Sequence, residues 1–318
     1  MDELHKFLFE GLPVRGVLVR LGASWRELLR RRDGQAAYPA PVRALLGEMA
    51  AAAALIQANI KFDGALVLQV FGDGPVKLAV AEVQPDLSFR ATAKVVGEVA
   101  ADAGLAAMLN LHGKGRCAIT LDPQDRSGGA QPYQGVVALH DDGGRPLQAL
   151  AEVLEHYMRQ SEQLDTRLVL AAGDDCAAGL LIQRLPVEGQ GNLEQRQRDD
   201  AVGVDEAFNR IAHLTATLTR EELLTLDADT LLRRLYWEED MRRFAPLHPN
   251  FACRCSRERV RGMLRELGAA EVEGIVAERG EVEIGCEFCG LQYRFDAVDV
   301  GEMFTPGRDQ PPAPSSLQ

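Results

Sequence analysis

The cysteines near the end of the chain constrain its fold more than any other feature. They form two close pairs, Cys253-Arg-Cys255 and Cys286-Glu-Phe-Cys289, separated by thirty residues. Zinc prefers four soft ligands in a tetrahedron, and two short pairs from distant parts of a chain can supply them. Gly290 follows the second pair and suits the tight turn that points two sulfurs at one ion. The spacing predicts one zinc ion bound by Cys253, Cys255, Cys286 and Cys289.

The predicted zinc-binding domain covers residues 251–304 and is small. A segment of roughly 50 residues cannot bury enough apolar surface to be comfortably stable alone. Structural zinc contributes about 10–16 kcal/mol in small metal-nucleated domains, whereas a whole domain is stable by only about 5–15 kcal/mol. We therefore expect that removing zinc unfolds this domain.

Spacing alone leaves open an inert structural zinc site and a nucleic-acid-binding zinc ribbon. Charge disfavours the ribbon, since residues 251–300 hold seven Arg and ten Asp or Glu. The whole chain has a formal net charge of −12, whereas nucleic-acid binders carry basic surfaces. His248 is close enough in sequence to be a ligand, but a structural site is full with four cysteines.

The Cys-x-Cys pair is the feature that an inert site explains poorly, because zinc knuckles usually have two to four residues between their cysteines. Either close pair could instead form a disulfide, whose sulfurs no longer serve as thiolate ligands. Such a site would convert an oxidant into local unfolding. A thiol–disulfide oxidoreductase that uses Cys286 and Cys289 is an alternative. It is disfavoured because zinc-bound thiolates are poor nucleophiles and no thioredoxin-like βαβ unit surrounds the pair.

The remaining length favours further domains, since 318 residues suit two or three. Residues 1–187 predict an α+β domain. Its helix Pro41–Ile60 is apolar on every face over Met49–Ile56, so we expect it to be buried between sheets as a β/α/β sandwich. The Asp-Gly turn after Phe71 predicts a hairpin. Predicted strands are Ala65–Phe71, Val76–Val83, Phe89–Val96, Cys117–Leu121, Val136–Leu139, Thr166–Ala172 and Leu180–Leu185, and Pro146–Gln163 predicts an amphipathic helix.

Residues 188–250 predict a helical linker. Its first part, Glu188–Asp200, is polar and is expected to be a mobile connector. A helix follows, and a second helical region is predicted over Arg220–Met241, with Thr219 and Glu222 as a capping box. Both helices are strongly apolar and need a surface to pack on. The Pro-rich tail, residues 305–318, is expected to be disordered.

No segment predicts a secretory signal or a membrane span. The first residues are acidic, and the longest apolar run, Met49–Ile56, is far shorter than the roughly 20 residues that a span requires. We therefore expect a cytoplasmic protein that binds neither membranes nor nucleic acid. We also expect Cys117 and Cys176 to be ordinary small apolar side chains.

The sequence resembles the redox-regulated chaperone family named for the thirty-three-kilodalton heat-shock protein. The run Cys253-Arg-Cys-Ser-Arg-Glu-Arg259, the thirty-residue gap and Cys286-Glu-Phe-Cys289 with Tyr293-Arg-Phe-Asp296 carry the resemblance most specifically. Leu180-Leu-Ile-Gln-Arg-Leu-Pro186 and Glu221-Glu-Leu-Leu-Thr-Leu226 agree with it. The polar segment Gly189–Ala201 and the tail are longer than the family pattern, and neither touches the cysteines.

This resemblance implies an ATP-independent holdase rather than an enzyme. It implies that the reduced, zinc-bound protein is inactive and that oxidation forms the disulfides Cys253–Cys255 and Cys286–Cys289. Zinc then leaves, the linker unfolds, and the protein dimerises, binds unfolding clients and passes them to foldase chaperones. We expect apolar linker residues to cover or form the client-binding surface: Val204, Phe208, Ile211, Leu214, Leu218, Leu231, Leu235, Tyr236 and Trp237.

Overall fold

The chain divides into two compact units, Met1–Ala252 and Cys253–Gln318. The computed structural model describes residues 2–32, 37–125, 129–185 and 196–305, and for residues 196–205 it describes only a helical backbone. The expected disordered tail lies outside the described residues except for Thr305. The mixed α+β class is confirmed. The domain boundaries at residues 187 and 250 remain predictions.

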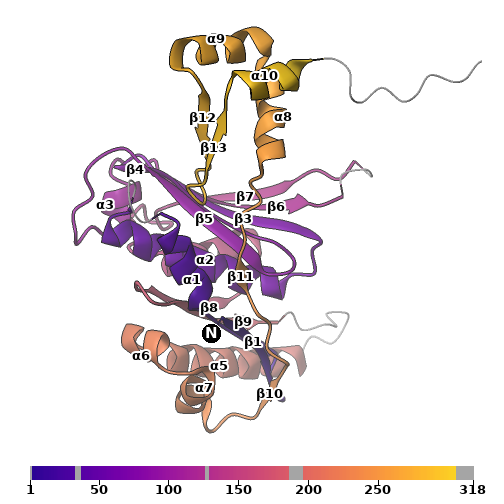
Figure 1. The fold of residues 1–318 in the computed structure, drawn as a ribbon. Helices are drawn as coiled ribbons and strands as arrows, with labels where there is room; N and C mark the ends of the chain where they lie inside the picture. Colours follow the sequence, from indigo (N-terminus) through magenta and orange to yellow (C-terminus); the bar gives the residue numbers. More distant parts are fainter. Residues whose placement is uncertain (1, 33–36, 126–128, 186–195, 306–318) are drawn as a thin grey trace, which may run out of the picture. The chain divides into compact units, whose positions relative to one another are not determined.

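Two sheets form the framework of the first unit (Figure 1). One has the strand order β10 (Met241–Arg243), β1 (Glu3–Phe9), β2 (Val14–Leu21), β9 (Ala177–Arg184) and β8 (Thr166–Ala172). The other has the order β11 (Asn250–Phe251), β5 (Ser88–Val95), β4 (Val76–Val83), β3 (Gly64–Phe71), β6 (Arg116–Pro123) and β7 (Tyr133–Ala138). The predicted hairpin is confirmed, because β3 pairs antiparallel with β4.

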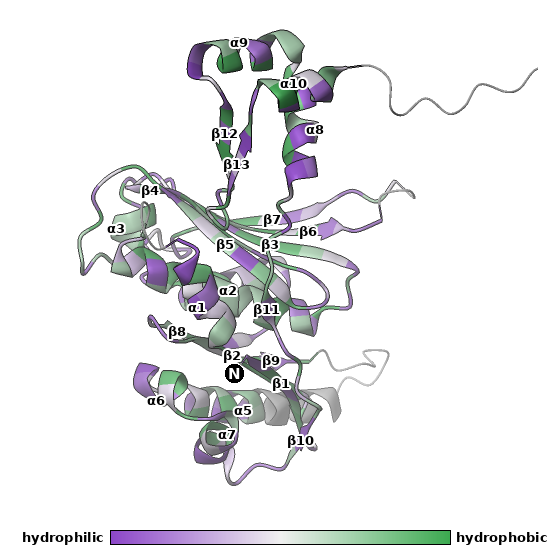
Figure 2. Cartoon of the chain, viewed as in Figure 1, coloured by the Kyte–Doolittle hydropathy of each residue, from purple (hydrophilic) through white to green (hydrophobic). Residues whose placement is uncertain are grey.

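Helix α2 (Ala40–Asn59) packs against strands of both sheets. Its residues from Met49 to Leu55 are fully buried and Ile56 is 6% exposed, which confirms the expected all-round burial. Figure 2 shows the apolar character of this helix. Further helices that precede the linker are α1 (Ala23–Arg30), α3 (Leu105–Leu109) and α4 (Leu150–Ser161).

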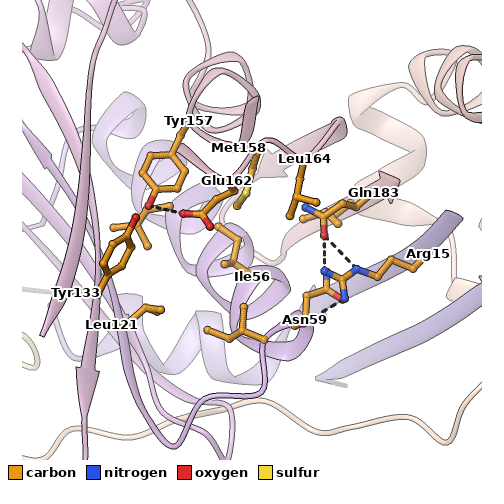
Figure 3. Close-up of a pocket in the computed structure, with 13 residues that line it drawn as sticks. Arg15, Ile56, Asn59, Leu121, Tyr133, Tyr157, Met158, Glu162, Leu164 and Gln183 are labelled. Carbon is orange, nitrogen blue, oxygen red and sulfur yellow. Dashed lines mark hydrogen bonds between the residues drawn. The ribbon is translucent and has the colours of Figure 1, made fainter. Parts of the chain in front are cut away.

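The last turn of α2 has no basic residue of its own. Its final carbonyls instead accept hydrogen bonds from basic side chains of the first two strands. Lys6 Nζ donates to Ala58 O at 2.6 Å, and Arg15 Nη1 donates to Asn59 O at 3.2 Å. Arg15 also donates to Gln183 (Figure 3). Burial lowers the pKa of both Lys6 and Arg15. These bonds satisfy helix-end carbonyls that water cannot fully reach.

The linker helices cover the other face of the five-stranded sheet. They are α5 (Arg196–Ala216), α6 (Arg220–Thr225) and α7 (Ala228–Tyr236). Apolar linker side chains form one cluster with Phe7, Phe9 and Leu180 of the sheet. The buried Tyr236 hydroxyl bonds to Thr215 at 2.7 Å, and its ring meets Phe9 edge-on at 5.1 Å. This sheet is the surface that the linker helices were expected to need.

Several sequence-based expectations differ from the structure. The prediction of one helical region over Arg220–Met241 is wrong. Leu226 is extended, and Asp227 caps a new helix by accepting a hydrogen bond from Thr230 N. Met241 instead belongs to β10, where it pairs with Phe9 of β1. The helix predicted from Pro146 begins at Leu150, since Pro146 forms a β-bridge with His140.

The connector Glu188–Asp200 overlaps α5 over residues 196–200, and its residues up to 195 lie outside the described part. The capping box of Thr219 and Glu222 is confirmed.

The second unit contains α8 (Arg257–Leu267), α9 (Ala269–Arg279), β12 (Val282–Gly285), β13 (Gln292–Phe295) and α10 (Ala297–Phe304). Strands β12 and β13 form an antiparallel hairpin. Seven buried residues form the core of the second unit: Leu264, Val272, Val282, Tyr293, Phe295, Val300 and Met303. This core is small, as expected for a unit that relies on another source of stability.

We predict that Gly47→Ala destabilises the first unit. A Cβ at Gly47 would lie 2.4 Å from Ala172 Cβ, and overpacking of this kind costs about 1–3 kcal/mol. The matched control is Gly262→Ala in α8, where no atom lies within 4 Å of the added Cβ and helix propensity should add up to about 1 kcal/mol. In urea unfolding measured by circular dichroism, the free energy of unfolding should fall in Gly47→Ala and rise in Gly262→Ala. A change of the same sign in both variants would contradict this packing.

We predict that Glu48→Gln stabilises the protein at pH 8 more than at pH 5. Burial raises the pKa of Glu48 in α2 to about 7, while Arg220 at 3.9 Å acts in the opposite direction. A raised carboxyl pKa makes the folded state bind more protons, so stability falls as pH rises from about 4.5 to 7. At pH 8 the free energy of unfolding of Glu48→Gln should exceed that of the unsubstituted protein by about 1–3 kcal/mol. The control Glu98→Gln removes an exposed charge, and a Glu48→Gln effect independent of pH would refute the assignment.

Candidate metal centre

The four predicted cysteines come together in the second unit. Their sulfurs all lie within 4.8 Å of one another. Cys253 Sγ lies 3.6 Å from Cys286 Sγ, and Cys255 Sγ lies 3.4 Å from Cys289 Sγ. Four sulfurs at about 2.3 Å from one ion would be roughly 3.8 Å apart, whereas a disulfide has a length of about 2.0 Å. The spacing fits four thiols around a metal ion.

Local backbone structure positions the second cysteine pair. Strand β12 ends just before Cys286, whose N–H donates to Leu291 O at 2.9 Å. Gly290 N donates back to Cys286 O at 2.8 Å. Gly290 has φ +72°, a conformation that glycine adopts without steric cost. This tight turn directs both sulfurs of the pair to the same place, as the sequence predicted.

The first pair approaches from the segment before α8. Ser256 caps this helix by accepting from Arg259 N at 3.2 Å. Cys253 and Cys255 therefore precede an ordered helix start, and their sulfurs reach the turn after β12. Helices α8 and α9 and strand β12 lie between the two pairs, so the sulfur cluster brings together the two ends of this thirty-residue segment.

The electrostatics of the cluster favour a bound cation. Cys289 is buried, and this desolvation, together with the neighbouring thiols, raises its pKa. The hydroxyl of Tyr293 lies beside Cys255, which raises the pKa of Tyr293. Deprotonating several thiols so close together requires a compensating positive charge. A soft divalent ion would supply that charge, and a four-sulfur donor set is the one that zinc prefers.

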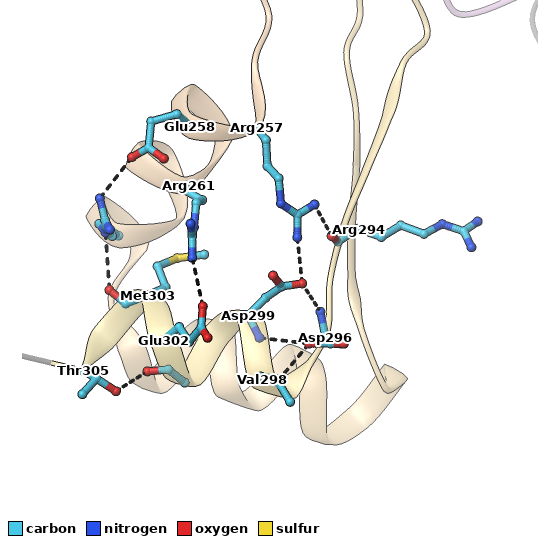
Figure 4. Close-up of polar contacts among 12 residues, drawn as sticks. Arg257, Glu258, Arg261, Arg294, Asp296, Val298, Asp299, Glu302, Met303 and Thr305 are labelled. Atoms are coloured by element: carbon cyan, nitrogen blue, oxygen red, sulfur yellow. Dashed lines mark hydrogen bonds and ion pairs between the residues drawn. The ribbon is translucent and has the colours of Figure 1, made fainter. Parts of the chain in front are cut away.

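A stripe of arginines on α8 ties this helix to α10 (Figure 4). Arg257 pairs with Asp299 at 2.7 Å, donates to Arg294 O at 2.7 Å, and stacks 4.2 Å above the Phe295 ring. Arg261 and Arg265 follow on the same face and contact Glu302 and Met303 O. These arginines are engaged within the unit. They give no support to a nucleic-acid-binding ribbon.

The stripe was not predicted as a structural device. Residues 251–300 contain seven arginines and ten acidic residues, and the spacing of Arg257, Arg261 and Arg265 by four residues was the available signal. Helix α10 and strand β13 were likewise not predicted, although Asp296 and Asp299 form a capping box at the start of α10.

The other candidate thiols and ligands lie elsewhere. Cys117 is fully buried in β6, and this burial raises its pKa to about 12. Cys176 is half-buried, which also raises its pKa. His248 belongs to the first unit, where its Nδ1 lies 3.1 Å from Asp2 O, and it is not one of the clustered donors.

Most of the candidate client-binding residues are buried within the first unit. Phe208, Ile211, Leu218, Leu231, Leu235 and Tyr236 are buried, and Leu214 is partly buried against the same cluster. Trp237 is 73% exposed and therefore contributes little to this packing. The side chain of Val204 lies outside the described part of the chain. No helix within the described residues is both long and apolar enough to cross a membrane.

Comparison with known proteins identifies the relatives of this chain. Residues 2–296 match the family described as Hsp33 protein. A 33 kDa chaperonin of Chromobacterium violaceum is 46% identical over 304 residues, which cover 95% of this chain and 94% of that one. A 33 kDa chaperonin of Methylobacillus flagellatus is 45% identical over 314 residues, covering 97% and 98%.

A solved structure shares the fold. The crystal structure of the 33 kDa chaperonin (heat shock protein 33 homolog) of Thermotoga maritima matches with a TM-score of 0.74 at 19% identity. The match covers 95% of this chain and 98% of that one. The two chains therefore share an arrangement of elements despite few identical residues.

We predict that Arg257→Ala loosens the second unit. The side chain is 45% exposed, so its ion pair alone is worth little. Loss of the carbonyl bond and ring stacking as well should cost about 1–2 kcal/mol. Amide hydrogen exchange in α10 should then rise about 5–30-fold. The matched control is Arg259→Ala on the same helix, whose guanidinium donates to Arg254 O. Unchanged α10 exchange in Arg257→Ala would show that the stripe is not structural.

Proposed function

Because the chain belongs to the Hsp33 family, a family of chaperones and not of enzymes, we propose that it is a redox-regulated, ATP-independent holdase. Its switch is the zinc site formed by Cys253, Cys255, Cys286 and Cys289. The observation that carries the proposal is the cluster of four free sulfurs within 4.8 Å in a unit with a very small core. The functional parts are a core over residues 1–187, a linker over 188–250 and the switch over 251–304.

In the reduced state the four thiolates hold one zinc ion, which neutralises their charge and links the start of the switch to the turn between β12 and β13. The metal then contributes a large part of the stability of the unit. The folded switch keeps the preceding linker docked. Docking buries apolar linker residues and the sheet residues Phe7, Phe9 and Leu180 in one cluster, so the apolar surface is withheld from other proteins.

Hydrogen peroxide is the proposed oxidant. Each close pair of thiolates gives up two electrons to form one disulfide, while one peroxide molecule and two protons become two water molecules. The expected bridges are Cys253–Cys255 and Cys286–Cys289. Sulfurs in disulfides cannot act as thiolate ligands, so the site loses its ion and the switch loses its main stabilising contact. The linker then leaves the sheet.

Release of the linker exposes an apolar surface to unfolding clients. The proposed binding residues are the linker side chains that are buried in the reduced protein, together with the apolar sheet face beneath them. A hydrophobic surface larger than a few hundred Å² is typical of protein-binding sites. We further propose that the activated protein dimerises in the cytoplasm and passes its clients to foldase chaperones, as the resemblance implies.

We predict that peroxide at heat-shock temperature releases one zinc ion per chain and turns on aggregation suppression. The assay compares reduced and oxidised protein in parallel for released zinc and for light scattering by a heat-unfolding client enzyme. The matched control is Cys176→Ser, which leaves the switch intact and should activate normally. Oxidised, zinc-free protein that protects the client no better than the reduced form would refute the holdase. Turnover of a disulfide substrate would instead support the oxidoreductase.

Mass mapping of the same oxidised sample tests the switch chemistry. The close-pair bridges should predominate because each closes a very short loop. Predominant bridges between the two pairs, for example Cys253–Cys286, would contradict this mechanism even if the holdase assay succeeded.

A further inference from the structure

The outer edge of β1 is covered by a short extended segment that follows the linker helices. We call this segment, residues 240–247, the strap; it includes β10, which pairs antiparallel with β1 (Figure 1). Glu10 N donates to Asp240 O at 2.8 Å, and Phe244 N donates to Lys6 O at 3.0 Å. Leu4 and Leu247 exchange two backbone bonds of 2.8 and 2.9 Å. The strap thus bonds to backbone groups of Leu4, Lys6 and Glu10 along this edge.

Side chains contribute little to holding the strap. Phe244 is 47% exposed and Leu247 is 41% exposed. Arg242 and Arg243 are also exposed, and they form ion pairs with Glu10 and Asp229 at the surface, where such pairs are worth little. Arg243 Nη2 also lies 3.3 Å from His5 Nδ1 of β1. Met241 alone among strap residues packs partly against the apolar cluster. Binding through backbone groups is largely independent of sequence.

The strap is positioned to leave with the linker. Residue 240 follows α7 by only a few residues, and the strap has no independent hydrophobic core. When α5 to α7 undock, the outward-facing groups of Leu4, Lys6 and Glu10 lose their partners. An unpaired sheet edge of this length is a template for any extended chain.

The face beside this edge is apolar. Phe7 and Phe9 point from β1 into the cluster that the linker helices cover. After undocking, one strand would therefore offer a row of unpaired backbone groups together with two aromatic rings. An unfolding protein presents the complementary features, namely unpaired backbone groups and apolar side chains at alternate positions.

We propose that the edge of β1 is a client-binding site at which an extended segment of an unfolding protein adds as a strand in place of the strap. The strap then acts as a built-in occupant of that site in the reduced protein. This proposal rests on the proposed function and deepens it, because it assigns backbone pairing at a named edge as the source of tolerance for many client sequences.

Single-residue hydrogen exchange on the oxidised full-length protein tests the proposal. The reporters are the amides of Leu4 and Glu10, which donate to the strap. The internal controls are the amides of His5 and Phe7, which alternate with them and point toward β2. Oxidation should speed exchange at the reporters, and a bound heat-unfolding client such as citrate synthase should slow it again at least fivefold. The controls should change much less in both steps.

A peptide competitor provides an independent readout. A peptide of residues 239–248 should compete with the client for the oxidised protein. N-methylation of its Phe244 amide removes the donor to Lys6 O, and loss of one such bond should weaken competition about fivefold or more. N-methylation at Arg243 is the matched control, because that amide points away from β1, and it should leave competition intact.

The outcomes separate this proposal from the proposed function. If oxidised protein fails to suppress aggregation, both fall. If it suppresses aggregation while client leaves Leu4 and Glu10 unprotected, or if both methylated peptides compete equally, only the strand-addition site is overturned. Reporter protection that appears without client and rises with protein concentration would mean that a second copy of the chain occupies the edge, which also overturns the proposal.

Discussion

Four thiols held within 4.8 Å of one another are the constraint on which the account depends. Their anionic forms repel, and burial of Cys289 makes its thiolate still more costly. One bound cation would resolve both problems, and under the proposed function the fold of a unit with a seven-residue buried core would then depend on that ion. The arginine stripe of α8 and the turn at Gly290 support this arrangement, but neither replaces the link between residues thirty positions apart.

The first unit has two apolar clusters that differ in how completely they are covered. Its inner core, around α2, is closed on all sides and its helix end is satisfied by Lys6 and Arg15. Its outer layer is different, because α5 to α7 share a second cluster with only one sheet face. The strap that follows them is attached mainly by backbone bonds to β1. Under the proposed function, this division would let the outer layer leave while the inner core stays folded.

The sequence predicted the features that are encoded locally. The cysteine spacing predicted the sulfur cluster, the apolar run Met49–Ile56 predicted the buried helix, and the Asp-Gly turn predicted the β3–β4 hairpin. It did not predict the break at Asp227, although Asp227 is a common N-cap residue type and its carboxylate accepts from Thr230 N. It did not predict the pairing of Met241 with Phe9 either, because that pairing depends on a tertiary contact. The first two strands and β11 were also missed. Two-residue pairings such as Asn250–Phe251 with β5 carry no periodic signal, and the partner lies far away in sequence.

We propose that oxidation of the four cysteines activates the chaperone by undocking the linker. Amide hydrogen exchange of α5 to α7 in the intact protein tests this during a peroxide titration, with zinc release and holdase activity recorded at each step. We expect protection of the Leu231, Leu235 and Tyr236 amides to be lost in proportion to zinc release and to the gain of activity. Full holdase activity with these amides still protected would contradict it.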